Sequence, residues 1–374
     1  MNFDLSEEQQ LVQDSVARFI QDNYGLEARQ TTVASSDDFN KKHWATMAEL
    51  GWLGLTLPEA HGGFGGNQID AMVIMEQFGK GLVLEPFFAS VVLGARALSL
   101  AGTEAQCSRL LPRVIDGSRQ LALGYAEEQA RFDMHDVVTR AQADGDGFII
   151  NGRKSMVQHG GTADQIIISA RTSGGQSDTN GISLFIIDAN TDGLTVTGFP
   201  TVDGLAAAEV ELKDVSVSAD ALLGELDNGY RILEAVAIDG ILAICAEAVG
   251  AMEMLYKDTV QYTQEREQFD HALAEFQVLQ HRMVEMFMEY EQCKSLLYRA
   301  TLEVVQNGSD ALRTVHALKH FVGKTGIFIG ENAVQLHGGM GVTEELRIGH
   351  YFKRLLVIDA QFGNSDYHLQ QFAA

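Results

Sequence analysis

The spacing of apolar residues changes twice along this chain of 374 residues, and the changes divide it into three parts. In the first and third parts apolar side chains recur at the spacing of an amphipathic helix. In the middle part they fall in short alternating runs separated by glycine turns. The sequence therefore predicts an α+β fold in three domains. These are an N-terminal α-helical domain over residues 1–120, a β-barrel-like antiparallel domain over 121–228 and a C-terminal four-helix bundle over 229–374.

The N-terminal part carries clear helix signals. Ser6 with Gln9 has the pattern of a capping box, which predicts that the first helix begins there. A second helix is expected over residues 68–78, ended by Gly79. The loop His61-Gly-Gly-Phe-Gly-Gly-Asn67 between them lacks the spacing of a dinucleotide-binding or phosphate-binding motif. It is more typical of a tight turn.

The middle part contains short strand-like runs with no helix between them. They include Phe148-Ile-Ile150, Gln165-Ile-Ile-Ile168, Ser183-Leu-Phe-Ile-Ile187 and Glu209-Val-Glu-Leu212. Because parallel strands need long crossover connections, usually helices, an antiparallel sheet is expected. In the last part, long helices are expected over residues 238–265, 276–305 and 310–337, with a shorter one after Thr343. Long helices joined by short connections are typical of a four-helix bundle.

Composition excludes several classes of function. The net charge of −24 argues against nucleic-acid binding, because no basic stripe offsets the repulsion from phosphate. The three cysteines are odd in number and widely spaced, which argues against a disulfide framework or a thiolate metal site. The N-terminus is acidic where a targeting peptide would be basic, and no apolar run is long enough to cross a bilayer. A cytoplasmic protein is therefore expected.

One carboxylate stands inside an otherwise apolar helix. Glu247 is the only charged residue between Asp239 and Glu253, and its apolar neighbours lie on more than one face, which indicates burial. A buried carboxylate without a partner is costly, and burial is a common way to prepare a general base. The alternative is a glutamate at a helix crossing that pairs with a distant arginine or lysine. The helix alone leaves both interpretations open.

A set of motifs follows in order along the chain. They are Leu57-Pro-Glu-Ala-His-Gly-Gly-Phe-Gly65, Asn151-Gly-Arg-Lys154, Arg266-Glu-Gln-Phe269, Phe276-Gln-Val-Leu-Gln-His-Arg282, Gln335-Leu-His-Gly-Gly-Met-Gly341 and Phe362-Gly-Asn-Ser-Asp366. In this order and spacing they resemble the acyl-CoA dehydrogenase family over nearly the whole chain. Within the family, the sequence most resembles the small subunit of two-subunit members such as pimeloyl-CoA dehydrogenase. The resemblance implies the acyl-CoA dehydrogenase fold and FAD-dependent α,β-dehydrogenation of an acyl-CoA thioester to the trans-2-enoyl-CoA.

In the reaction that the resemblance implies, a carboxylate removes the α-proton while a hydride leaves the β-carbon for N5 of the flavin. Many family members carry the catalytic glutamate near the C-terminus, where this chain has Phe362. Others carry it early on the long bundle helix, where this chain has Gly240. A third group resembles this chain in placing a glutamate in an Ala-Glu-small-Val-Gly setting. The resemblance therefore points to Glu247 as the base.

The resemblance also implies cofactor contacts in the C-terminal part. Arg266 and Phe269 match a pair whose arginine reaches the diphosphate of a flavin held by a neighbouring subunit. Gln335, Gly338 and Gly339 match the segment that lies against the adenosine part, where glycines allow close approach of the backbone. The plain alternatives are a surface charge for Arg266 and a helix C-cap for the glycines.

Further cofactor contacts are expected from Met156, Gln158 and Asn364. Met156 and Gln158 stand where the family has an aromatic residue and a hydroxyl beside the isoalloxazine. The family's Thr-Glu-Pro…Gly-Ser-Asp stretch, however, is replaced by residues 125–133, which contain neither proline nor Gly-Ser. This departure raises the alternative that a partner subunit completes the flavin pocket.

Two functions therefore remain open. One is a dehydrogenase that passes electrons to an electron-transfer flavoprotein, and the other is a non-catalytic or half-site subunit of a heteromeric enzyme. The resemblance implies a homotetramer or a heterotetramer with a sister chain. It leaves open both the acyl group and the basic residues that bind the CoA phosphates. His316 and His320 have the spacing of two metal ligands, but no acid or third ligand accompanies them, so no metal is expected.

Overall fold

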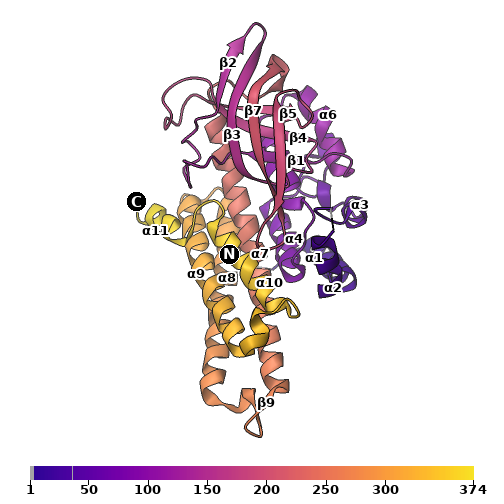
Figure 1. Cartoon of the computed structure of the whole chain (residues 1–374), viewed down its shortest axis with the longest axis vertical. Coiled ribbons are helices and arrows are strands. Elements are labelled where there is room, and N and C mark those ends of the chain that lie inside the picture. The colour runs from indigo at the N-terminus through magenta and orange to yellow at the C-terminus, as the bar shows by residue number, and fades with distance from the viewer. Residues whose placement is uncertain (1–3, 36) are drawn as a thin grey trace. The chain divides into compact units, whose positions relative to one another are not determined.

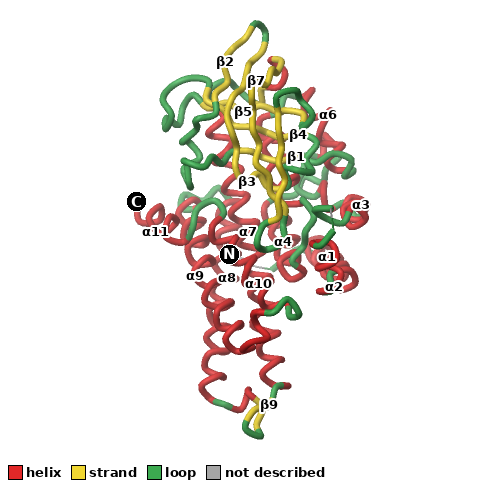
Figure 2. Tube along the Cα trace, in the orientation of Figure 1, coloured by secondary structure: helices red, strands yellow, loops and turns green. Residues whose placement is uncertain are grey.

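The computed structural model describes residues 4–35 and 37–374. Contacts between Cα atoms divide the chain into two compact units. The helical unit comprises Met1–Thr31, Asn67–Val83 and Ile241–Ala374, and the sheet unit comprises Thr32–Gly66 and Leu84–Gly240. Helices at both ends of the chain and strands in its middle confirm the predicted fold class (Figures 1 and 2).

In the helical unit, α9 packs against α8, α10 and α11 (Figure 1). The long helices are α1 (Glu7–Asn23), α4 (Gln68–Gly81), α7 (Gly229–Glu265, from Ile241 in this unit), α8 (Gln277–Val305), α9 (Ala311–His337) and α10 (Arg347–Ala360). The shorter elements are α2 (Leu26–Val33, to Thr31 in this unit), α11 (Ser365–Ala373), the hairpin strands β9 (Glu267–Gln268) and β10 (His271–Ala272), and the short helices η5 (Leu273–Glu275) and η6 (Gly338–Val342). α7 begins earlier than predicted, and α11 was not predicted.

The first helix begins as predicted, but the second does not end where expected. Ser6 and Gln9 form the predicted capping box at the start of α1. α4 runs through Gly79 instead of ending there. A Cβ atom added to Gly79 would lie 1.9 Å from the backbone oxygen of Glu247 on α7. Gly79 therefore does not end the helix. It permits α4 and α7 to pack closely, because any side chain at this crossing would clash.

The sheet unit is built on one large sheet with strand order β6-β7-β3-β2-β4-β5-β8, and β1 pairs with β4. The strands are β1 (Leu121–Gly124), β2 (Arg140–Asp144), β3 (Gly147–Gln158), β4 (Gln165–Arg171), β5 (Ile182–Asp188), β6 (Leu194–Pro200), β7 (Ala206–Ser218) and β8 (Leu222–Leu223). The helical segments are α3 (Lys41–Glu49), η1 (Trp52–Gly54), η2 (Glu59–His61), η3 (Phe88–Ala95), α5 (Arg96–Ala101), α6 (Glu104–Ile115) and η4 (Ala219–Ala221).

The expectation of an antiparallel sheet was wrong at β4, which is parallel to two of its neighbours. β1 runs parallel to β4, and β2 also meets β4 in parallel at Arg140 and Arg171. The connection from β1 to β4 passes through the antiparallel hairpin of β2 and β3 and contains no crossover helix. A parallel pair needs a long connection, and here strands supply that length.

The core of the sheet unit lies along β4 and β5, whose residues are buried almost throughout. β3 pairs with β7, and the register between them shifts between Lys154 and Val157, which marks a β-bulge. Met156 lies in this bulge with a left-handed backbone, φ +53°. Within the described residues, no helix is both long enough and apolar enough to cross a membrane.

Candidate functional site

An open pocket lies in the helical unit where the end of α7, the start of α8 and the end of α9 meet. Its volume is about 1030 Å³. Four residues predicted from the sequence to contact a cofactor line it: Arg266, Gln335, Gly338 and Gly339. They come from segments about seventy positions apart in the sequence. The structure therefore brings this part of the predicted site together.

The pocket is lined by two uncompensated cations. Arg282 lines it together with Arg266, and neither guanidinium forms an ion pair with any residue between 4 and 35 or 37 and 374. A guanidinium presents a planar fork of donors that suits carboxylate or phosphate. Both arginines lie in motifs that carry the resemblance, but a cofactor contact was predicted for Arg266 alone, and the place of Arg282 in the pocket was not predicted.

The glycine pair borders open space at the same pocket. A Cβ atom added to Gly338 or Gly339 would have no atom within 4 Å, and Gly338 has a left-handed backbone, φ +60°. Both residues end α9 and begin η6, so the C-cap interpretation also describes them. Their backbone is accessible to a ligand in the pocket.

A stack of two rings forms part of the pocket wall. The rings of Tyr262 and His337 are 4.2 Å apart between centroids, with an interplanar angle of 25°. Nδ1 of His337 pairs with the backbone oxygen of Ala333 at 2.8 Å. Burial lowers the pKa of His337, so its ring is neutral near neutral pH. His337 lies inside the predicted Gln335–Gly341 motif, but the sequence gave no sign of its partner.

Phe269 lies at the tip of the β9–β10 hairpin and does not line the pocket. Phe269 and Asp270 are the two turn residues, and both have left-handed backbones, with φ of +57° and +61°. This is the geometry of a type I′ turn, which asparagine and glycine usually occupy. Phe269 is 85% exposed. Its ring lies edge-on to that of Phe276, with centroids 6.5 Å apart, so a largely exposed aromatic side chain is held here at the cost of backbone strain.

Glu247 is buried on α7 and paired with Arg354 on α10. Nε of Arg354 donates to Oε1 at 2.6 Å, and Nη2 donates to Oε2 at 2.7 Å. The two side chains are 6% and 4% exposed. These contacts match the second interpretation left open by the sequence, a glutamate at a helix crossing with a distant arginine. The role of Glu247 as a base stays a prediction.

Asn364 and Phe362 lie in the turn between α10 and α11. Oδ1 of Asn364 accepts the backbone N–H of Tyr367 at 2.9 Å and so caps α11. Lys319 is fully buried, and its Nζ donates to the backbone oxygens of Asp359 and Gly363 at 2.9 and 2.8 Å. The buried lysine therefore stabilises this turn through its backbone oxygens. The cofactor role of Asn364 stays a prediction.

Met156 and Gln158 are neighbours on the bulged part of β3 in the sheet unit. Met156 is 52% exposed, and Gln158 is half-buried. Their predicted place beside the flavin ring remains a prediction. The bulge itself was not predicted, because a register shift leaves no mark in the hydrophobic pattern.

The two histidines with metal-ligand spacing have other partners. Nδ1 of His316 pairs with Nδ1 of His368 at 2.8 Å, and Nδ1 of His320 pairs with the backbone oxygen of Ser365 at 2.8 Å. Among residues 4–35 and 37–374, no group of three or more histidine, cysteine or acidic side chains is placed to hold a metal ion.

Comparison with known proteins identifies the class to which this fold and pocket belong. Sequence models of the three acyl-CoA dehydrogenase domains match the chain: the N-terminal domain at residues 6–118, the middle domain at 122–215 and the C-terminal domain at 228–374. The chain belongs to the acyl-CoA dehydrogenase family. This confirms the predicted family and the predicted enzyme class, an oxidoreductase that acts on acyl-CoA.

Several relatives cover the chain from end to end. The probable acyl-CoA dehydrogenase YngJ of Bacillus subtilis (strain 168) is 30% identical over 371 residues, which cover 98% of this chain and 97% of the relative. The FAD complex of PigA matches with 25% identity and a TM-score of 0.92, covering 100% and 98% of the two chains. A structure named Tcur3481-Tcur3483 steroid ACAD matches with 27% identity and a TM-score of 0.87, covering 98% and 97%.

Proposed function

We propose that the chain catalyses the FAD-dependent α,β-dehydrogenation of an acyl-CoA thioester to the trans-2-enoyl-CoA. The observation that carries this proposal is the pocket in which Arg266, Arg282, Gln335 and the glycine pair converge. FAD is the cofactor, supported by the family and by the related FAD complex of PigA. When bound, it supplies the hydride acceptor for the β-carbon.

The pocket fits the adenosine diphosphate half of FAD in charge and in shape. Arg266 and Arg282 offer donors to the diphosphate, and the exposed backbone at Gly338 and Gly339 leaves room for close approach. The stacked rings at Tyr262 offer a flat surface to a base or sugar. A polyanion would therefore find compensating charge here despite the acidic chain.

Phe269 supports a site shared between subunits. Because its side chain is 85% exposed on a strained turn, we infer that it contacts a neighbouring chain or that chain's cofactor. The assembly is a homotetramer or a heterotetramer with a sister chain. The name of the related Tcur3481-Tcur3483 enzyme, which joins two chains, and the predicted likeness to the pimeloyl-CoA dehydrogenase small subunit both favour the second form.

Glu247 is the proposed α-proton base. The proton leaves the α-carbon for a carboxylate oxygen as the thioester oxygen is hydrogen-bonded and the enolate charge develops. Arg354 occupies one acceptor position on each oxygen of Glu247. A carboxylate has about four acceptor positions, so others remain for the proton. Arg354 would then orient the base, as a third group orients the base in other proton-transfer sites.

The base can be tested with a matched pair of substitutions. Glu247→Gln alone would set an amide against the guanidinium, so it is combined with Arg354→Gln, which allows the two amides to pair. If Glu247 is the base, turnover falls by roughly 10²–10⁴-fold relative to Arg354→Gln alone. Arg354→Gln retaining measurable turnover that the second substitution leaves unchanged would contradict the assignment. The electron acceptor is expected to be an electron-transfer flavoprotein.

A second function, a half-site or non-catalytic subunit, is favoured by one observation. Both oxygens of Glu247 are engaged by Arg354, as in a structural ion pair. The two functions are separated by the visible absorption spectrum of the chain purified alone and with a co-expressed sister chain. Flavin bands in the lone chain that are bleached by an acyl-CoA under anaerobic conditions indicate the dehydrogenase. Flavin that appears only with the sister chain indicates the half-site. A panel of linear, dicarboxylic, steroid and aromatic acyl-CoA thioesters identifies the substrate class.

A further inference from the structure

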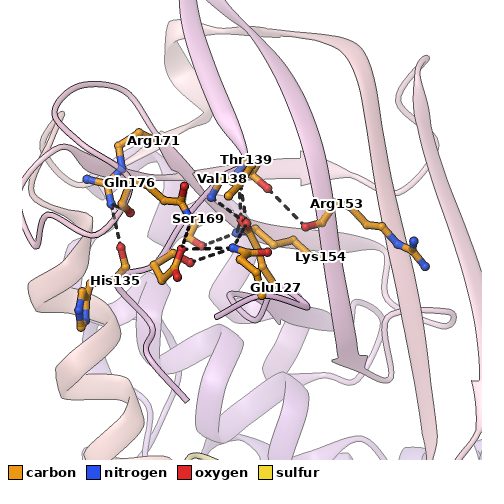
Figure 3. A network of polar contacts seen from close by, with 11 residues as sticks. Glu127, His135, Val138, Thr139, Arg153, Lys154, Ser169, Arg171 and Gln176 are labelled. Carbon is orange, nitrogen blue, oxygen red and sulfur yellow. Dashed lines mark hydrogen bonds and ion pairs between the residues drawn. The ribbon is translucent and has the colours of Figure 1, made fainter. Parts of the chain in front are cut away.

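The sheet unit contains a buried ion pair that takes no part in the proposed proton transfer. Nζ of Lys154 on β3 donates to Oε1 of Glu127 at 2.6 Å and to Oγ of Ser169 on β4 at 2.9 Å (Figure 3). Lys154 is fully buried and Glu127 is 6% exposed. Two charges removed from water in this way need an explanation, because their desolvation often exceeds their mutual attraction.

Glu127 fastens the segment that connects β1 to β2. Its carboxylate accepts the backbone N–H of Val138 at 2.8 Å and of Thr139 at 3.1 Å, as well as Nε2 of Gln129 at 2.9 Å. These bonds converge on one side chain (Figure 3). One carboxylate therefore closes both ends of the segment over residues 127–139, and Lys154 fixes that carboxylate to the sheet.

Both members of the pair are charged near neutral pH. Burial acts to raise the pKa of Glu127, but the charge of Lys154 and the hydrogen bonds from Lys154, Thr139 and Gln129 bring it to about 2. Burial lowers the pKa of Lys154 to about 8, against the opposing effect of Glu127. The hydrogen bonds to Val138 and Thr139 are thus made to an ionised carboxylate and are of the stronger kind.

The same lysine stands at the start of the bulge that carries Met156. The register of β3 against β7 shifts directly after Lys154, and Met156 takes a left-handed backbone there. Next to Lys154, the backbone N–H of Ser155 donates to the oxygen of Ala126 at 2.9 Å. Successive residues on the two segments, 126–127 and 154–155, are therefore joined. A strained, half-exposed methionine is held at a fixed place in the sheet unit by bonds to its neighbours.

We propose that Lys154 and Glu127 are positioning residues that hold the bulged segment of β3 so that Met156 and Gln158 face the flavin ring. The inference rests on the proposed function and on the place beside the flavin ring that the family resemblance implies for these two residues. The pair acts through backbone position, since neither charged group is exposed to a ligand. This explains why a buried ion pair stands where apolar side chains of similar volume would serve the core equally well.

The test uses a double substitution that leaves no unpaired charge, Lys154→Met with Glu127→Leu. The matched control is Arg153→Met, which removes an exposed ion pair to Glu209 from the same strand. Hydrogen–deuterium exchange by mass spectrometry follows peptides over residues 125–139 and 153–159. The visible circular dichroism of bound FAD follows the surroundings of the ring, and the melting temperature follows overall stability.

The double variant is expected to keep a melting temperature close to that of the unmodified chain. Its two peptides are expected to exchange roughly tenfold to hundredfold faster, because hydrogen bonds to a charged group are lost. The circular dichroism of the flavin is also expected to change. The control variant is expected to leave both the exchange rates and the flavin circular dichroism unchanged. Unchanged exchange in both peptides would overturn the positioning role whether or not flavin binds. Faster exchange with unchanged flavin dichroism would overturn the link to the ring. Faster exchange in a chain that never binds flavin would overturn that link through failure of the proposed function itself.

Discussion

The ion pair between Glu247 and Arg354 makes a sharp prediction about stability. Its N–O distances of 2.6 and 2.7 Å and its side-chain exposures of 6% and 4% leave little access for water to replace a lost partner. Arg354→Met leaves the buried carboxylate of Glu247 without a partner. Breaking a buried pair in this way costs about 3–5 kcal/mol of unfolding free energy. Replacing both residues, Arg354→Met with Glu247→Leu, is expected to be close to neutral.

The chain offers a matched control for this experiment. Arg96 and Asp239 form an ion pair of equal length, 2.6 Å, but the arginine side chain is 36% exposed. Arg96→Met is therefore expected to cost no more than about 1 kcal/mol. The measurement is urea unfolding near neutral pH, followed by far-ultraviolet circular dichroism.

Two outcomes would refute this reasoning. If Arg354→Met costs no more than Arg96→Met, Glu247 is reached by water or by another partner when the arginine is removed. If the double substitution costs as much as the single one, the arginine contributes through packing and not through charge. A cost restricted to Arg354→Met supports the burial of a charge pair and separates that effect from any loss of turnover.

Three further predictions follow from single positions. Burial raises the pKa of Glu85 to about 8, so the folded chain binds this proton more tightly than the unfolded chain, and stability is lost as pH rises from about 4.5 through 8. Glu85→Gln is therefore expected to raise the unfolding free energy by up to about 4 kcal/mol at pH 8 and by little at pH 5. Glu104→Gln is the exposed control. An equal gain at both pH values would contradict this expectation. Arg282→Ala is expected to raise the Kd for FAD roughly tenfold or more and to make that Kd less dependent on salt. Flavin fluorescence measures both effects. An unchanged Kd would show that Arg282 does not contact FAD. Gly79→Ala is expected to lower the melting temperature by several degrees because its Cβ would lie 1.9 Å from a backbone atom. Gly25→Ala, which faces open space, is expected to have little effect. Equal shifts in melting temperature would argue against the tight crossing.

Local patterns predicted the elements well because each depends on residues close in sequence. The capping box at Ser6 and Gln9 and the return of helical spacing after the β part are examples. Gly79 shows where this reasoning fails. A glycine near the end of a helical pattern is usually a C-cap, and only the neighbouring helix reveals that this one permits close packing. The burial of Glu247 was predictable because it depends on apolar residues in the same helix. Its partner was not predictable. Arg354 lies 107 positions away, and hydrophobic period carries no information about pairing.

The site was predictable only where a motif fixed it. Arg266 and Gln335 were found because their neighbours formed recognisable runs, and the structure places both at one pocket. Arg282 ends one of the motifs that carry the resemblance, but the resemblance gave it no contact with the cofactor, so its place in the pocket was not predicted. The parallel pairing of β1 with β4 was missed for a related reason, since strands that pair across a long connection leave no local mark.

A chain with a net charge of −24 repels a polyanionic ligand such as coenzyme A or FAD, and the distribution of partners among the cations shows where this repulsion is offset. Lys154, Lys319 and Arg354 are buried, and each donates to carboxylates or backbone oxygens, so their charges are satisfied inside the protein. Arg266 and Arg282 differ, because within the described part of the chain they have no ion-pair partner and line the same pocket. A mobile polyanion is repelled by the chain as a whole but meets two arginines without ion-pair partners at this pocket. Selection for a phosphate ligand therefore does not require a basic protein. It requires two arginines at one pocket with which no described carboxylate forms an ion pair.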